Sequence, residues 1–122
     1  MERIEEFTLE GRNFMYIDFS NVMSNKEFVE HTAVVKPQIA KYPECSLYTI
    51  TNIENVRLDS KSKRIVAEYM AHNKPYVKHG AVIGLDGIKK MFAQTIMKMS
   101  GRDNMHFVFT KEQAIDLLLK QD

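Results

Sequence analysis

Residues 72–90 read His72-Asn-Lys-Pro-Tyr-Val-Lys-His-Gly-Ala-Val-Ile-Gly-Leu-Asp-Gly-Ile-Lys-Lys90, and this stretch decides the fold. Asn73-Lys-Pro75 ends a helical segment, because proline lacks a backbone donor and disfavours helix at the residue before it. Ala81-Val-Ile-Gly-Leu85 is a short apolar run that is typical of a buried strand. Gly84-Leu-Asp-Gly87 predicts a turn, with Asp86 capping the next helix. The stretch is therefore one strand-turn-helix step of an α/β fold.

The rest of the chain repeats this step. Strands are predicted at residues 4–9, 13–19, 46–52, 81–85 and 106–109, and helices after caps at Ser24, Asp59 or Ser60, Asp86 and Thr110. Ser24-Asn-Lys-Glu27 and Thr110-Lys-Glu-Gln113 both match a capping box. The order ββαβαβαβα predicts an α/β fold with a mainly parallel sheet, an antiparallel N-terminal edge strand and helices packed on the sheet. The length of 122 residues fits one domain, residues 1–122.

Each predicted helix carries an apolar stripe at three- and four-residue spacing, which should face the sheet. The three longest stripes are Phe28, Thr32, Val35 and Ile39; Ile65, Val66, Tyr69 and Met70; and Ile88, Met91, Phe92, Ile96 and Met99. Pro37 lies late in the first helix and should kink it or break it. Cys45 is expected to be a small buried apolar residue.

The charge composition of the chain argues against nucleic acid as a partner. With 17 basic and 16 acidic residues, the net charge is +1. The chain therefore has no overall field that would attract nucleic acid, and no aromatic residues for base stacking are interleaved with its basic clusters. No apolar run approaches the ~20 residues of a membrane helix. The lone Cys45 and the polar N-terminus, which does not resemble a signal peptide, predict a cytoplasmic protein that does not span a membrane.

In an open α/β sheet, ligands bind at the carboxyl ends of the parallel strands. The loops at these ends give the candidate ligand- or partner-binding residues, which are Asp18, Asn21, Asn52, Asp59, Gly84, Asp86 and Gly87.

Each candidate also has a structural interpretation. Gly84 and Gly87 can present backbone N–H groups to a phosphate, but their spacing matches neither a dinucleotide fingerprint nor a P-loop, and Asp86 would repel an anion. Asp18 can act as a general base, yet such residues more often accept hydrogen bonds from loop N–H groups. We therefore expect no enzymatic activity and no cofactor. We also expect no metal site, since the four histidines show no paired ligand spacing (His31, His72, His79 and His106).

Several segments together resemble the SpoIIAA-like group of STAS/SEC14-type domains. They are Tyr16-Ile-Asp-Phe-Ser20, Ser46-Leu-Tyr-Thr-Ile-Thr51, Asn73-Lys-Pro-Tyr-Val-Lys78, Ala81-Val-Ile-Gly84, Gly87-Ile-Lys-Lys90 and the closing Thr110-Lys-Glu-Gln-Ala114. The resemblance covers nearly the whole chain and implies a small sheet flanked by helices.

The resemblance implies two functions. The first is a non-enzymatic regulatory domain that binds a protein partner, as anti-sigma-factor antagonists do, with phosphorylation of a serine at the start of the second helix. The matching segment is Asp59-Ser60-Lys61-Ser62, which makes Ser60 the phosphorylation candidate although Lys61 and Ser62 depart from the Asp-Ser-Ser-Gly motif. The second is a small carrier of a lipid or another apolar small molecule, which needs an apolar pocket inside one domain or shared across a homodimer.

Overall fold

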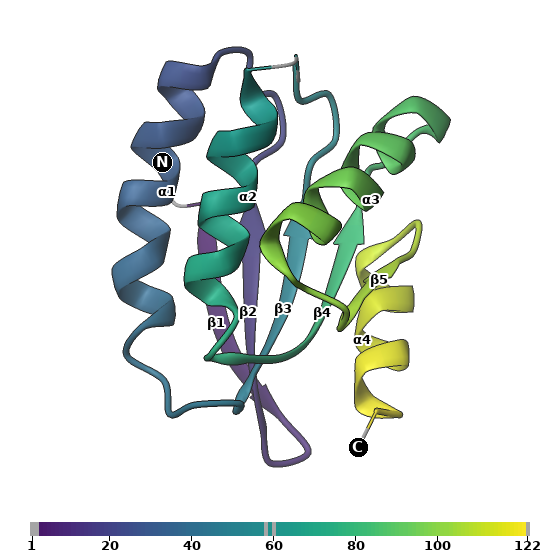
Figure 1. Ribbon diagram of the computed structural model, residues 1–122. Helices are drawn as coiled ribbons and strands as arrows, with labels where there is room; N and C mark the ends of the chain where they lie inside the picture. Colours follow the sequence, from purple (N-terminus) through teal and green to yellow (C-terminus); the bar gives the residue numbers. More distant parts are fainter. Residues whose placement is uncertain (1–2, 58, 60, 122) are drawn as a thin grey trace.

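Five strands form one sheet in the order β1-β2-β3-β4-β5 (Figure 1). The computed structural model describes residues 3–57, 59 and 61–121, without the side chains of residues 87–89 and 92. The strands are β1 (Ile4–Leu9), β2 (Arg12–Asp18), β3 (Leu47–Asn52), β4 (Val77–Ile83) and β5 (Met105–Phe107). The helices are α1 (Asn25–Ile39), α2 (Ser62–Asn73), α3 (Gly87–Ser100) and α4 (Lys111–Leu119). β1 and β2 are antiparallel and all other pairs are parallel, so the predicted fold class is confirmed.

Helices cover both faces of the sheet. α1, α2 and α3 lie in front of it in Figure 1, and α4 packs on the opposite face. The first core contains Met15, Ile17 and Leu47 with α1 and α2, and the second contains Tyr48 and Leu118. β3 is buried on both faces because it is the central strand. None of the helices in the described part of the chain is both long enough and apolar enough to cross a membrane.

The predicted caps start two helices, although only the second forms a complete capping box. The Ser24 hydroxyl accepts from Glu27 N at 3.2 Å and opens α1. Thr110 and Gln113 form a complete capping box at α4. Pro37 lies inside α1, and the helix continues past it to Ile39, so the proline does not split the helix.

β2 and β3 differ from the predicted strands by no more than one residue at either end, and β4 and β5 differ by more. β4 begins at Val77 rather than residue 81, because it pairs with β3 along that strand's whole length. It ends at Ile83, because Gly84 takes a φ of +86°, a left-handed conformation that leaves the strand. β5 spans only Met105–Phe107.

Two predictions about burial are wrong. Cys45 is exposed, because it lies in a turn before β3 with a φ of +54°. Met91 and Met99 of α3 are 71% and 54% exposed, whereas Ile96 is buried. Ala93 and Met97 face the sheet side of α3, and Met91 and Met99 each lie two positions from one of them, about 160° around the helix, so these methionines point away from the sheet. The side chains of Ile88 and Phe92 lie outside the described part.

Candidate functional site

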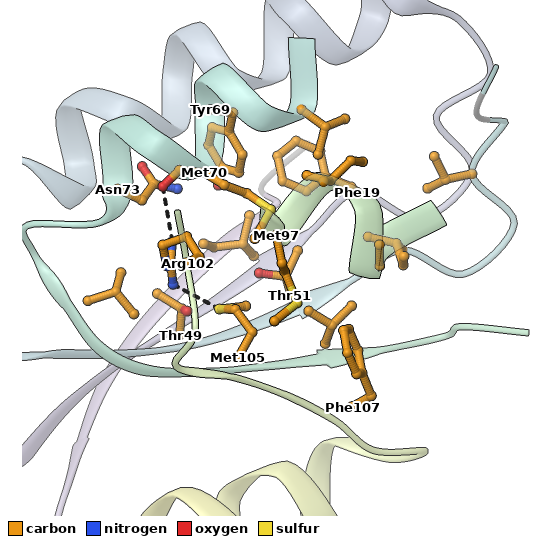
Figure 2. A pocket seen from close by; sticks show the side chains of 18 of the residues that line it. Phe19, Thr49, Thr51, Tyr69, Met70, Asn73, Met97, Arg102, Met105 and Phe107 are labelled. Atoms are coloured by element: carbon orange, nitrogen blue, oxygen red, sulfur yellow. Dashed lines mark hydrogen bonds between the residues drawn. The ribbon is translucent and has the colours of Figure 1, made fainter. Parts of the chain in front are cut away.

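An apolar cavity of about 90 Å³ lies between the sheet and helices α2 and α3 (Figure 2). Side chains from both layers line it, among them Ile17, Val82 and Phe107 from the strands and Val66, Ile96 and Met97 from the helices. A water molecule needs only about 10–15 Å³ of such volume, so the cavity is large enough for a small ligand. An apolar pocket is therefore present within this single domain.

A cationic side chain, Arg102, projects into this cavity. It follows Gly101, which ends α3 with a φ of +71°, and Arg102 N donates to Met97 O at 3.1 Å. This is the pattern of a Schellman motif, which turns the chain back under the helix. Arg102 is only 5% exposed, and Figure 2 shows it between Asn73 of α2 and Thr49 of β3. The turn therefore places a guanidinium inside the first core.

The Arg102 guanidinium is held by neutral acceptors. Nε donates to Asn104 Oδ1 at 2.9 Å, Nη1 to Met70 O at 3.1 Å, and Nη2 to Met105 Sδ at 2.8 Å. Among residues 3–57, 59 and 61–121, no carboxylate forms an ion pair with it. Burial lowers the pKa of Arg102 to about 10, so it is still charged at pH 7. The site thus holds a buried positive charge without a buried counter-charge.

Tyr69 of α2 adds an unused polar group to the same cavity. Its side chain lines the cavity and is 5% exposed. Its hydroxyl is buried and makes no hydrogen bond of ordinary geometry with any described residue, although the Asn73 side chain lies close enough to lower its pKa. Burial raises the pKa of Tyr69, which therefore stays a neutral O–H donor at any ordinary pH. A buried hydroxyl without a partner costs about 1–3 kcal/mol, so something must offset it.

The predicted residues at the carboxyl ends of β2 and β3 hold the loops together. Asp18 Oδ1 accepts from Ser20 N at 2.8 Å. Asn52 Oδ1 accepts from Glu54 N at 2.9 Å, and its amide donates to the Tyr16 hydroxyl at 3.0 Å. These contacts match the structural interpretation of Asp18 and Asn52.

Asn21 belongs to the same network. It has a φ of +64°, its N–H donates to Glu54 O at 2.9 Å, and its side-chain oxygen accepts from Asn55 at 2.8 Å. The structure therefore brings Asn21 together with the loop after β3, although no contact here points to a ligand.

The third predicted loop follows β4. A Cβ on Gly84 would lie 2.5 Å from the backbone nitrogen of Glu54, so Gly84 allows two loops to approach each other closely. The carbonyl of Asp86 accepts from Lys90 N at 2.9 Å, which makes Asp86 the residue that opens α3, with Gly87 as the first helical residue. This geometry matches a structural turn.

Asp59 caps α2 although it lies three residues before Ser62, the first residue of the helix. Its Oδ1 accepts from Lys61 N at 2.9 Å and from Ser62 N at 3.0 Å, while Ser62 Oγ accepts from Asp59 N at 3.1 Å. Ser62 is buried and its hydroxyl donates to Asn25 Oδ1 at 2.6 Å, which ties α2 to the start of α1. Ser60, the phosphorylation candidate, lies outside the described residues.

Replacing Asp59 with alanine is expected to destabilise the protein in a pH-dependent way. The bonds from Ser62 are the largest cause that lowers the pKa of Asp59 below its ordinary value of 3.8. Because the Asp59 carboxylate has a lower pKa in the folded state than in the unfolded state, its ionised form stabilises the fold above pH 3.8. This stabilisation is lost as the pH falls through the folded-state pKa. Urea denaturation of wild type and Asp59→Ala should show a gap at pH 7 that narrows below pH 3.8. A gap that is independent of pH would contradict this, and Asp59→Asn should keep most of the capping.

A histidine pair lies on the opposite face of the sheet. One ring from each of the five strands lies in a row there, namely Phe7, Phe14, Tyr48, His79 and His106; the first four stack in sequence, and His106 is tilted against His79. His106 Nε2 lies 3.3 Å from His79 Nδ1. This pair could not be predicted from local sequence patterns, because the two residues are 27 positions apart and meet only through pairing of β4 with β5. In the described part of the chain, no group of three or more metal-ligating side chains forms around it.

Sequence reasoning missed the role of Arg102, although one signal was present. In a Schellman motif, the second residue after the helix is usually apolar and packs against the last turn. Here Ser100-Gly101 predicts the motif and Arg102 occupies that inward-facing position. A charged residue at a position that is normally apolar was the available clue.

Comparison with known proteins adds no assignment. No protein-family model matches this chain, and a search among curated proteins finds no match either. The SpoIIAA-like resemblance of the sequence therefore stays a prediction.

Proposed function

We propose that this protein is a non-enzymatic binding domain that holds a small apolar or amphipathic molecule between its sheet and helices α2 and α3. The observation that supports this is the apolar cavity of about 90 Å³ in the first core. Protein interiors usually contain few voids larger than a water molecule. At roughly 24 cal/mol per Å³, leaving this cavity empty costs about 2 kcal/mol. A bound apolar ligand recovers that free energy.

The proposal selects one of the two functions that the sequence resemblance implies. The carrier function requires an apolar pocket, and the cavity supplies one. The regulatory function, with a protein partner and a switch at Ser60, stays a prediction. Phosphate on Ser60 in protein purified from its own host, detected by native mass spectrometry, would support that second function. A homodimer through the edge strand β1 and a cytoplasmic location are likewise predictions.

Hexan-1-ol and benzyl alcohol are suitable probes of the cavity. Both are expected to bind the wild-type protein saturably, with dissociation constants of about 1 mM or lower, as measured by isothermal titration calorimetry. Ala93 of α3 lines the cavity, and Ala93→Leu fills part of it with a side chain. This variant should bind both alcohols at least about tenfold more weakly.

The urea denaturation midpoint of Ala93→Leu shows whether the variant is folded, and it should equal or exceed the wild-type value. Absence of saturable binding to the wild type, or equal binding by a folded Ala93→Leu variant, would overturn the proposal.

A further inference from the structure

We propose that the natural ligand of the cavity carries a carboxylate, which pairs with the Arg102 guanidinium and accepts a hydrogen bond from the Tyr69 hydroxyl. This inference rests on the proposed function and specifies the chemical class of the ligand: a monoanionic amphiphile with a short apolar tail. Two independent observations carry it, the buried unpaired charge of Arg102 and the buried unused hydroxyl of Tyr69.

The first argument concerns charge. Arginine is almost never fully buried unless it is paired, because an isolated charge loses its hydration without compensation. Arg102 is 5% exposed, and among the described residues the carboxylate that acts on its charge is Asp103, with a smaller effect than burial or Tyr69. Asp103 itself is exposed, so it does not bring a carboxylate into the cavity. A ligand carboxylate supplies the missing counter-charge.

The second argument concerns hydrogen-bond donors. A guanidinium has five N–H donors, and the described contacts of Arg102 use three of them. One of the three acceptors is the sulfur of Met105, and a thioether is a weak acceptor. A carboxylate oxygen is a much stronger one, and methionine has three rotatable bonds with which to move aside. The ligand therefore displaces Met105 from Nη2.

Arg102 also has a structural role that the test must separate from ligand binding. Its Nη1 donates to Met70 O, one of the last four carbonyls of α2 that have no partner inside the helix. Loss of this bond affects folding, whereas loss of charge recognition affects only anionic ligands. The Tyr69 hydroxyl has no such role, because it makes no hydrogen bond of ordinary geometry with any described residue and interacts only weakly with the Asn73 side chain.

The test compares carboxylates with neutral molecules of the same shape by calorimetry at pH 7. Wild-type protein should bind hexanoate at least about tenfold more tightly than hexan-1-ol, or benzoate at least about tenfold more tightly than benzyl alcohol, and hexylamine more weakly than hexan-1-ol. The pair that shows the preference tells whether the tail is a chain or a ring. If the alcohols bind and neither carboxylate is preferred, this inference fails while the proposed function stands. If no probe binds, the proposed function fails, and this inference fails with it.

Two variants assign the preference to its residues. Arg102→Met should lose the preference for the carboxylate but bind the alcohol within about threefold of wild type. Tyr69→Phe should bind the carboxylate about three- to tenfold more weakly, with a urea midpoint equal to or above that of wild type. This second variant keeps the inference testable if Arg102→Met does not fold. A carboxylate preference that survives in folded Arg102→Met, or an unchanged carboxylate affinity in Tyr69→Phe, would overturn the assignment.

Discussion

Replacement of Gly84 by alanine is expected to lower the free energy of unfolding by about 3 kcal/mol or more. Gly84 has a φ of +86°, in which a residue with a Cβ is strained by about 1–3 kcal/mol. The added Cβ would also lie 2.5 Å from Glu54 N and 2.8 Å from Glu54 Cα. These are backbone atoms held in place by neighbouring loops, since Glu54 O accepts from Asn21 N and Ile53 N donates to Ile83 O. Neither side of the contact can move freely.

Gly11 provides the matched control for this variant. It lies in the turn between β1 and β2 with a φ of +76°, and a Cβ there would meet nothing within 4 Å. Gly11→Ala therefore shares the backbone strain but not the clash, and a loss of about 1 kcal/mol is expected. Urea denaturation with equal m-values measures both changes. Equal losses in the two variants would show that the close approach to Glu54 contributes nothing.

Replacement of Phe19 by alanine is expected to lower the free energy of unfolding by about 3–5 kcal/mol. Phe19 is buried directly after β2, and its ring stacks on Phe28 at a centroid distance of 4.9 Å and meets Tyr69 edge-on at 5.6 Å. It also lines the cavity, so its removal enlarges a void that already exists. Surrounding side chains can collapse into the space only in part, and this places the effect among large core deletions.

Phe109 is the control for Phe19. It is the same residue type but is 84% exposed, so Phe109→Ala should change the free energy of unfolding by no more than about 0.5 kcal/mol. Benzene binds engineered apolar cavities, and it should raise the urea midpoint of Phe19→Ala more than that of Phe109→Ala. A loss below about 1 kcal/mol in Phe19→Ala would contradict a well-packed ring at this position.

Most of the fold could be predicted because its signals are local. Capping residues such as Ser24 and Thr110 indicate where a helix begins from a pattern of only four residues. Proline and glycine indicate where helices and strands end. The periodicity of apolar residues then separates strands from helices. Strand ends were less predictable, as β4 shows, because pairing with β3 extends it beyond its apolar run.

The candidate site could be predicted only in part. The loop residues at the carboxyl ends of the strands were named from topology, and the structure brings Asn21 and Asn52 into one network with the loop after β3. The apolar spacing predicts Tyr69 on the inward face of its helix, and it is buried there. Its unused hydroxyl could not be predicted, because a missing partner depends on every side chain that surrounds it.

The sequence by itself determined the element order, the mainly parallel sheet and most of the faces that become core, since these follow from patterns within a few residues of each other. Met91 and Met99 of α3 are exceptions. Only the tertiary structure decided where the cavity lies, that Arg102 enters it without a counter-charge, and that His79 meets His106. Such features arise from residues far apart in the chain. Whether a void remains between α2, α3 and the sheet depends on how the side chains of all three fill the space.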